Sequence, residues 1–238
     1  MNPVPLFLMI VTLPLLLGGC NQSSSVLSYE IHGDNVTITD CEVGTSGELV
    51  IPDTIKGKPV TTIGDSAFQY NKLTSITIPD GVTSIGEKAF SGCWRLTSIT
   101  IPDSVTSIGD YAFYYCTSLT SITIPESVTS IGESAFENCT SLTSITIPAS
   151  VASIGAGAFY ECASLTSIIY RGSTAPDLGI NAFVYISNNA TITAPVGATG
   201  YGISFGGVNA LDTTAPVITL VGDADVTIYS GNSYTDAG

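Results

Sequence analysis

The stretch LTSITIPESVTSIGESAFENCTS, residues 119–141, decides the fold because the chain repeats it on both sides. Four copies begin at Leu73, Leu96, Leu119 and Leu142, each 23 residues after the last, with neither gap nor insertion. A looser copy precedes them in GELVIPDTIKGKPVTTIGDSAFQYNK, and a decaying copy follows in LTSIIYRGSTAPDLGINAF. Repetition at a fixed period of this length is typical of a solenoid, and altered edge copies are typical of its terminal caps.

The first half of each copy has the pattern of a strand followed by a second apolar pair. Apolar and polar side chains alternate in residues 119–124, which predicts a half-buried strand. Pro125 ends this strand because proline donates no hydrogen bond to a ladder. Val128 and Ile131 follow, and we expect the next residue, Gly132, to make a tight turn.

The second half of each copy, ESAFENC at residues 133–139, predicts one short helical turn. Glu133 lies near its N-terminus, where a negative charge is favourable. The side chains expected to face inward are Leu119, Ile122, Ile124, Val128, Ile131, Ala135, Phe136 and Cys139. Burial of about 1.5 to 3 kcal/mol per large side chain does not offset the ordering entropy of a whole copy. Stacking of the copies is therefore what folds the chain.

The repeated phrase L-x-x-I-x-I-P…V-x-x-I-G-x-x-A-F-x-x-C resembles the BspA-like class of leucine-rich repeat over roughly residues 46–188. This resemblance implies a curved, strand-lined solenoid on bacterial or protist cell-surface proteins, often described as adhesins that bind host matrix proteins or other cells. We therefore expect a β-rich repeat solenoid of the leucine-rich-repeat type, with short strands, short helical turns and about six repeats.

The first 20 residues resemble an export signal. An apolar stretch at residues 6–17 is too short to span a bilayer, although no Lys or Arg precedes it as signals normally require. Residues 17–20, LGGC, resemble the lipobox of bacterial lipoproteins, which implies acylation of Cys20. The alternative is an ordinary secretion signal that ends near a cysteine. We expect an exported protein, either a lipoprotein of the outer membrane or cell surface or a secreted protein.

Changes of pattern divide the chain into five segments. The last of them contains the stretch APVITLVGDADVTIYSGNSYTDAG, residues 215–238. This stretch resembles the opening strands of a bacterial immunoglobulin-like surface module, and we expect only the start of this β-sandwich to be present. The expected segments are a signal peptide at 1–20, a tether and N-terminal cap at 21–45, the solenoid at 46–188, a C-terminal cap and linker at 189–213, and the truncated immunoglobulin-like module at 214–238.

The charge balance excludes two classes of partner. The chain has a formal net charge of -14, which repels phosphate backbones and anionic lipid surfaces. We therefore expect no nucleic-acid binding, and membrane attachment only through a lipid at Cys20. Apolar residues make up 44% of the chain and charged residues only 11%, a composition that favours an extracellular protein.

The sequence does not predict an enzyme. His32 is the only histidine, so the repeats cannot assemble a Ser-His-Asp or Cys-His site, and we expect it to be a surface or capping residue. No H-E-x-x-H, phosphate-binding loop or nucleophile-elbow motif occurs, and we expect no cofactor.

Four cysteines at equivalent positions predict a line of thiols along the solenoid: Cys93, Cys116, Cys139 and Cys162. A metal site needs thiolates that converge on one point, and parallel Cβ vectors disfavour disulfides between copies. We expect buried, inert thiols that pack as small hydrophobic groups, with a metal or disulfide ladder as the alternative. Cys41 lies outside this line.

Two columns of carboxylates also follow the repeat. One contains Asp53, Asp80, Asp103 and Glu126, and the other contains Asp65, Glu87, Asp110 and Glu133. Calcium binding is one interpretation, but hard cations need several converging oxygens and each column supplies one per copy. The favoured interpretation of the second column is charge at helix N-termini.

Candidate partner-binding residues lie where the copies differ. The outward strand face carries only hydroxyls, as in Ser121 and Thr123. Such a face does not by itself distinguish one partner from another. Large aromatic and arginine side chains, the types that anchor interfaces, flank the A-F-x-x-C segment. These candidates are Trp94, Arg95, Tyr111, Tyr114, Tyr115 and Tyr160. The alternative is partly buried edge packing.

Two functions remain open from the sequence. The first is a monomeric cell-surface repeat protein that binds a protein or glycan, as an adhesin for host matrix proteins or other cells. The second is a passive spacer that presents a downstream domain.

Overall fold

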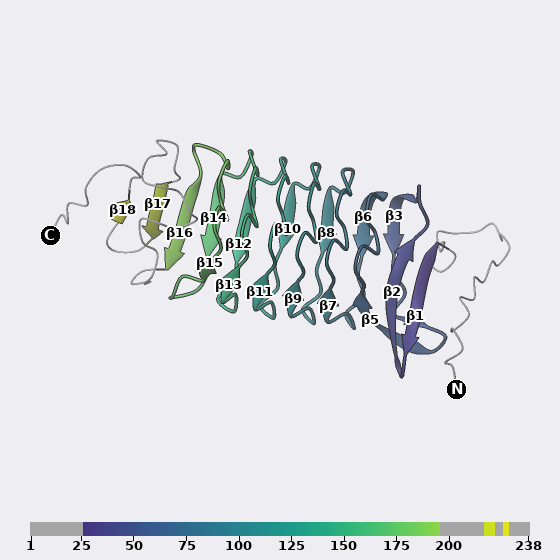
Figure 1. Cartoon of the computed structure of the whole chain (residues 1–238). Coiled ribbons are helices and arrows are strands. Elements are labelled where there is room, and N and C mark those ends of the chain that lie inside the picture. The colour runs from purple at the N-terminus through teal and green to yellow at the C-terminus, as the bar shows by residue number, and fades with distance from the viewer. Residues whose placement is uncertain (1–25, 196–216, 222–225, 229–238) are drawn as a thin grey trace, which may run out of the picture.

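The computed structural model describes residues 26–195 and two further strands at 217–221 and 226–228. These residues form an elongated solenoid in which each copy of the repeat makes one turn (Figure 1). The predicted repeat solenoid is thus confirmed. Among the described residues there is no helix, and therefore none long and apolar enough to cross a membrane.

One sheet runs the length of the solenoid, and in the four regular copies its strands come from the V-x-S-I segments. Its strands pair in the order β1 (Leu27–His32), β2 (Asn35–Cys41), β5 (Lys58–Ile63), β7 (Ser84–Ile85), β9 (Ser107–Ile108), β11 (Ser130–Ile131), β13 (Ser153–Ile154) and β15 (Asp177–Leu178). β1 and β2 are antiparallel, whereas the pairs from β2 onward are parallel and join equivalent positions of the repeat. β4 (Thr54–Ile55) adds an antiparallel pair with β5. The isoleucine of the second apolar pair, with the serine before it, therefore forms a short strand of its own in each regular copy.

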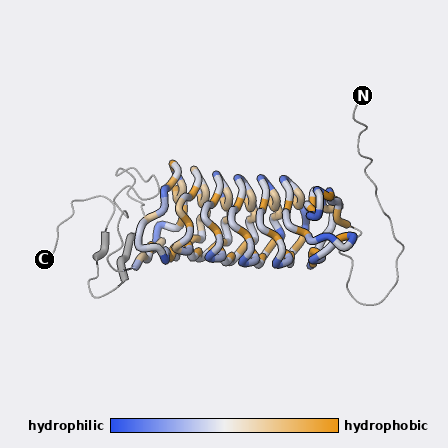
Figure 2. Tube along the Cα trace, turned by 90° about the horizontal axis from the view of Figure 1, so that it is seen from below, coloured by the Kyte–Doolittle hydropathy of each residue, from blue (hydrophilic) through white to orange (hydrophobic). Residues whose placement is uncertain are grey.

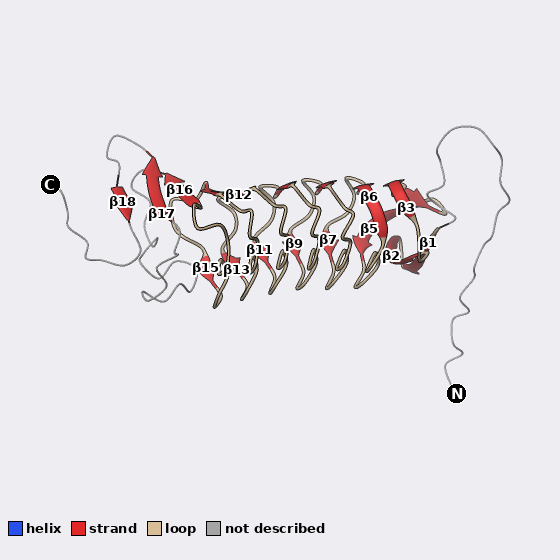
Figure 3. Ribbon diagram, turned by 90° about the horizontal axis from the view of Figure 1, so that it is seen from above, coloured by secondary structure: helices blue, strands red, loops and turns tan. Residues whose placement is uncertain are grey.

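The L-T-S-I-T-I segments form a second row of parallel strands (Figures 1 and 3). Four make one sheet, in the chain order β3 (Ser46–Val50), β6 (Lys72–Thr77), β8 (Ser98–Thr100) and β10 (Ser121–Thr123). The other sheet contains β12 (Ser144–Ile147), β14 (Ser167–Tyr170), β16 (Thr191–Pro195), β17 (Val217–Val221) and β18 (Val226–Ile228), the last antiparallel to β17. The amide of Thr143 donates to the carbonyl of Thr120 at 3.4 Å, so the backbone ladder continues between the two sheets.

The ends of the chain are only partly described. β16 lies in the stretch expected to form the C-terminal cap and linker, and it pairs in register with β14. Residues 1–20, with the expected lipidation at Cys20, lie outside the described residues. So does the expected immunoglobulin-like module at 214–238, apart from the backbones of β17 and β18.

The A-F-x-x-C segments form turns, and the prediction of a short helical turn was wrong. Within the segment at 133–139, the amide of Glu137 donates to the carbonyl of Ser134 at 3.2 Å. The amide of Phe136, however, donates to Ala158 of the following copy at 2.7 Å, and the same bond recurs along the array. A helix would direct these amides back along the segment. Because they bond to the next copy instead, the turns form a third backbone ladder.

The inward residues predicted from the repeat are all buried. In the central copy, the eight side chains from Leu119 to Cys139 expected to face inward are at most 7% exposed. Figure 2 shows the corresponding hydrophobic positions, in orange, recurring turn after turn. The phenylalanines form one continuous stack, with ring centroids 4.9 to 5.2 Å apart and planes within 9° of parallel: Phe68, Phe90, Phe113, Phe136, Phe159 and Phe183. At this separation the parallel rings are offset, which is a favourable aromatic arrangement.

The repeated thiols are buried and free, as the sequence predicts. Each donates to the carbonyl of a phenylalanine in the preceding copy, as Cys139 Sγ does to Phe113 O at 3.3 Å. Burial raises the pKa of Cys93 and of Cys162 to about 12, and raises those of Cys116 and Cys139 well above the usual value. Thiols held in the protonated form are neither nucleophiles nor metal ligands. These four thiols therefore act as packing groups of the core.

Alkaline pH is expected to destabilise the solenoid through these thiols. In the unfolded chain a thiol ionises near its usual pKa of 9.0, whereas in the fold Cys162 stays protonated until about pH 12. The unfolded state therefore binds fewer protons in this window, and stability present below pH 9 is lost as pH rises. We expect Cys162→Ser, which replaces the thiol donor by a hydroxyl that does not ionise in this range, to reduce this loss by about 1 kcal/mol per pH unit. Urea unfolding at pH 8 and 10.5 measures it, and parallel pH dependences for both proteins would contradict the assignment.

The repeated glycine directly precedes the turn, and close approach of the copies is what requires a glycine there. Gly132 does not have a positive φ. A Cβ at this position would lie 2.6 Å from the carbonyl carbon of Gly109 and 2.6 Å from the amide nitrogen of Asp110. The equivalent glycines meet the preceding copy in the same way: Gly86, Gly109, Gly155 and Gly179. Only a residue without a side chain allows neighbouring turns to stack here.

Candidate functional site

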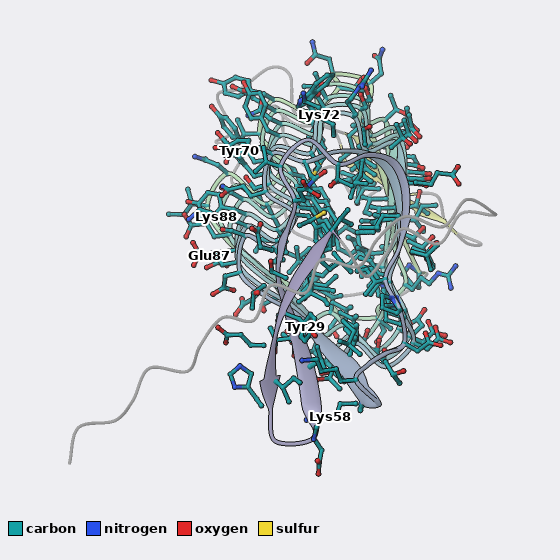
Figure 4. The ribbon with its side chains drawn as sticks, turned by 90° about the vertical axis from the view of Figure 1, so that its right-hand side faces the viewer. Tyr29, Lys58, Tyr70, Lys72, Glu87 and Lys88 are labelled. Atoms are coloured by element: carbon teal, nitrogen blue, oxygen red, sulfur yellow. The ribbon has the colours of Figure 1, made fainter. Side chains whose placement is uncertain are left out.

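The A-F turns make up one side of the solenoid, which we call the turn face. Viewed along the axis, Tyr70, Glu87 and Lys88 point outward on this side, while Lys72 lies at a corner (Figure 4). The turn face comprises residues 65–70, 87–92, 110–115, 133–138, 156–161 and 180–185. The copies differ most at these positions, so a selective surface can arise here.

Two positions in every turn have a left-handed backbone, the residue before the alanine and the second residue after the phenylalanine. Their φ values lie between 49° and 71° at Ser66, Tyr70, Lys88, Gly92, Tyr111, Tyr115, Ser134, Asn138, Gly157, Glu161, Asn181 and Tyr185. This conformation costs roughly 1 kcal/mol or more for a residue other than glycine. Tyrosine occupies it four times, which is unusual for a bulky side chain. Tyr70, Tyr115 and Tyr185 are consequently exposed by 72%, 48% and 63%.

Four tyrosines gather on the turn face, and we call them the tyrosine patch: Tyr70, Tyr111, Tyr114 and Tyr115. The rings of Tyr111 and Tyr114 meet edge to face at 5.8 Å, and those of Tyr114 and Tyr115 lie 5.2 Å apart. Tyr70 extends across the following copy, where its ring carbon would stand 2.3 Å from a Cβ on Gly92. Gly92 therefore makes room for the Tyr70 ring beside the other three.

Charged groups surround the patch. The Lys88 ammonium lies 5.3 Å from the centroid of the Tyr111 ring and pairs with Glu87. On the other side, the Tyr111 hydroxyl donates to Glu133 Oε1 at 3.2 Å. This bond and the Glu133 charge raise the pKa of Tyr111, and burial followed by the Glu137 charge raises that of Tyr114. At neutral pH the phenols of Tyr111 and Tyr114 therefore stay neutral.

The structure separates the predicted candidates into three groups. Tyr111, Tyr114 and Tyr115 are brought together in the patch. Trp94 and Arg95 lie at the neighbouring corner, where the guanidinium lies 5.1 Å from the indole ring, and no ring contact among the described residues joins them to the patch. Tyr160 pairs with Tyr185, edge to face at 5.2 Å. The alternative of edge packing describes Tyr111, Tyr114 and Tyr160, which are half-buried, better than it describes Trp94 and Tyr115, each 48% exposed.

Tyr70, Tyr185 and Lys88 were missed by the sequence analysis. Tyr70 and Tyr185 occupy the same column as Tyr115, the second position after the phenylalanine. Aligning the edge copies with the four regular ones would have found both tyrosines. The position of Lys88 over a ring of the next copy has no comparable signal in the sequence.

Two carboxylates of the second acidic column join neighbouring copies, and among the described residues there is no helix for the column to cap. Asp65 accepts a hydrogen bond from the amide of Glu87 at 2.8 Å, and Asp110 accepts one from Glu133 at 2.7 Å. In the other column Glu126 pairs with Arg171 at 3.5 Å. Within residues 26–195 no group of three His, Cys, Asp or Glu side chains could hold a metal ion. Asp65 and Asp110 thus have a structural role that the helix interpretation did not foresee.

The strand-face hydroxyls and His32 are on the surface. Ser121 and Thr123 of β10 are exposed, as expected of the outward strand face. The threonines just before these strands instead donate to the preceding copy, as Thr120 does to Thr97 O at 3.2 Å. His32 is exposed and lies 3.1 Å from Glu30, which confirms it as a surface residue.

Comparison with known proteins places the array in a family. The family described as BspA type leucine rich repeat region matches residues 61–198 with six copies. A search of curated proteins found no match.

Solved structures share the fold. The leucine-rich repeat protein TpLRR of T. pallidum is 30% identical with a TM-score of 0.63, over 70% of this chain and 89% of that protein. A leucine-rich cell surface protein of Faecalibacterium prausnitzii is 30% identical with a TM-score of 0.59, over 74% of this chain and 55% of that protein. The pneumococcal vaccine antigen PcpA, 23% identical with a TM-score of 0.57 over 74% of this chain and 50% of its own, shares the fold alone. This chain belongs to the BspA-type leucine-rich repeat family.

Proposed function

We propose that this protein is an exported cell-surface repeat protein that binds a partner through the tyrosine patch, as an adhesin for host matrix proteins or other cells. The observation that carries the proposal is the concentration of three contacting tyrosines on one copy, at 111, 114 and 115. The equivalent positions of the next copy hold Ser134, Glu137 and Asn138. The core of the solenoid does not require this difference, because both copies bury the same alanine, phenylalanine and cysteine.

The patch has the properties of an interface anchor. Tyrosine offers a large contact area with few rotamers to immobilise, and such side chains dominate the binding energy of many interfaces. Mutual ring contacts and the left-handed backbone of Tyr111 and Tyr115 restrict the rings before a partner arrives. A preorganised surface loses less entropy on binding. A protein ligand suits this surface, and a glycan stacked on the rings remains the other candidate.

Cell-surface location is supported by the family and by the F. prausnitzii relative, which is described as a cell surface protein. The proposed attachment is an acyl chain at Cys20, followed by a short polar tether. In cells that make the protein, Cys20→Ser is then expected to move it from the membrane fraction to the soluble fraction.

Binding to immobilised matrix proteins and glycans tests the proposal. The variant Tyr114→Ser/Tyr115→Asn takes its new residues from the same columns of neighbouring copies, Ser91 and Asn138, and so preserves the turn. We expect it to lose at least about tenfold in affinity for the bound partner, since anchor side chains contribute more than 1 kcal/mol each. Ser121→Ala/Thr123→Ala, on the strand face of the same copy, is the matched control and should bind normally. If the wild-type protein binds no member of the panel, a passive spacer is favoured.

A further inference from the structure

The turn face carries an excess of negative charge around the tyrosines. Its only basic residue among the described copies is Lys88, which is already paired with Glu87. Its carboxylates are Asp65, Glu87, Asp110, Glu133, Glu137 and Glu161. Glu133 touches the patch through the Tyr111 hydroxyl, and Glu137 is close enough to act on Tyr111, Tyr114 and Tyr160. A ligand on the patch therefore meets the carboxylates of Glu133 and Glu137. The one lysine of the described turn face is already paired and does not balance them.

Lys88 shows that a ring of the patch can hold a cationic side chain. Its ammonium lies over the Tyr111 ring at 5.3 Å while it pairs with a carboxylate. An aromatic face attracts a cation through its quadrupole, and the attraction grows when a carboxylate lies nearby. Tyr70 and Tyr115 are exposed rings in the same surface, and no lysine or arginine among the described residues lies over them. Their exposed faces can therefore receive a cation from a partner.

The dimensions of this surface suit a short extended segment. Tyr70 and Glu137 belong to copies three steps apart, which corresponds to about 14 Å at the strand spacing of parallel sheets. An extended chain covers that distance with about four residues. Anionic ligands, such as acidic peptides or sulfated glycans, would be repelled by the same carboxylates and by the net charge of -14.

We propose that the tyrosine patch, with Glu133 and Glu137 at its edge, binds a lysine- and arginine-rich segment of a partner protein. This inference rests on the proposed function and specifies its ligand. The cationic side chains lie over Tyr70 and Tyr115 and pair with the carboxylates. Association is accelerated by the acidic surface and weakened by salt.

Fluorescence anisotropy with labelled peptides tests the proposal directly. The probes are a peptide with the core KRKR and matched peptides with the cores QNQN and EDED. We expect only the KRKR peptide to bind the wild-type chain, with an affinity that falls by about tenfold or more between 50 and 500 mM NaCl. Equal binding of the QNQN peptide would overturn the proposal.

Two variants separate the patch from the overall charge of the protein. Glu137→Gln removes a half-buried carboxylate and Asp103→Asn removes an exposed one. Asp103 lies in the first acidic column, away from the turn face. We expect Glu137→Gln to weaken KRKR binding about threefold to tenfold and Asp103→Asn to leave it unchanged. Equal effects would mean that bulk charge attracts the peptide, which contradicts a built site. Circular dichroism confirms that both variants are folded.

The two proposals fail in different ways. If Tyr114→Ser/Tyr115→Asn abolishes binding to a matrix protein, but the KRKR peptide neither binds nor competes, the patch is a binding surface and the basic ligand is wrong. If the same variant changes no binding to any partner and no peptide binding, both proposals are wrong.

Discussion

Replacing Phe136 by alanine is expected to lower the free energy of unfolding by about 4 kcal/mol. Phe136 is completely buried, and its ring stacks on Phe113 and on Phe159, each at 5.2 Å. The substitution removes both stacking contacts and leaves a cavity in the middle of the array. Because each turn of a solenoid contacts only its neighbours, the loss weakens two successive interfaces. Urea unfolding followed by far-UV circular dichroism measures the effect.

The first phenylalanine of the stack is the matched control. Phe68 is also buried, but among the described residues its ring stacks on Phe90 alone. Since an aromatic pair contributes about 0.5 to 1.5 kcal/mol beyond the area it buries, Phe68→Ala should cost about 1 kcal/mol less than Phe136→Ala. Phe136→Leu, which retains most of the volume, should lose less than half as much. Identical losses at positions 68 and 136 would show that stacking along the ladder does not stabilise the fold.

Replacing Gly132 by alanine, which adds one methyl group, is expected to cost about 3 kcal/mol. The new Cβ would lie 2.5 Å from Asp110 Oδ1 and 2.6 Å from the carbonyl carbon of Gly109. Neither side can move away freely, because the amide of Gly132 donates to Ile108 O at 2.9 Å and Gly109 donates to Ile85 O at 3.0 Å. Alanine must therefore separate two turns or break the hydrogen bond from Glu133 to Asp110.

Gly33→Ala is the control, because it measures the cost of replacing a glycine where no clash occurs. Gly33 has a φ of +62°, and a Cβ there would meet nothing within 4 Å. We expect a loss of about 1 kcal/mol, from backbone strain alone. The urea midpoints of the two variants can be compared directly. A Gly132→Ala protein as stable as Gly33→Ala would show that the copies can move apart without cost.

Only part of the candidate site could be predicted from the sequence. Tyr111, Tyr114 and Tyr115 could be proposed because aromatic residues at variable positions of a regular array indicate a surface. Tyr70 lies in the same column as Tyr115 and could have been found by alignment, but the position of its ring over Gly92 could not. Lys88 could not be proposed, because its ammonium lies over Tyr111 of the next copy. Contacts of this kind depend on the rise and rotation between turns, which no single copy encodes.

By itself, the sequence determined the architecture and the core. Its 23-residue period required stacked copies, and the apolar columns identified the buried side chains and the inert thiols, because a side chain repeated without change in every turn faces the same environment in every turn. Only the tertiary structure decided what joins one turn to the next. The A-F segment became a third ladder instead of a helix, Gly132 proved necessary for close approach, and Asp110 became a link to Glu133. The physical reason is that an amide or carboxylate pairs with the nearest suitable group, and in a solenoid that group often belongs to the neighbouring turn.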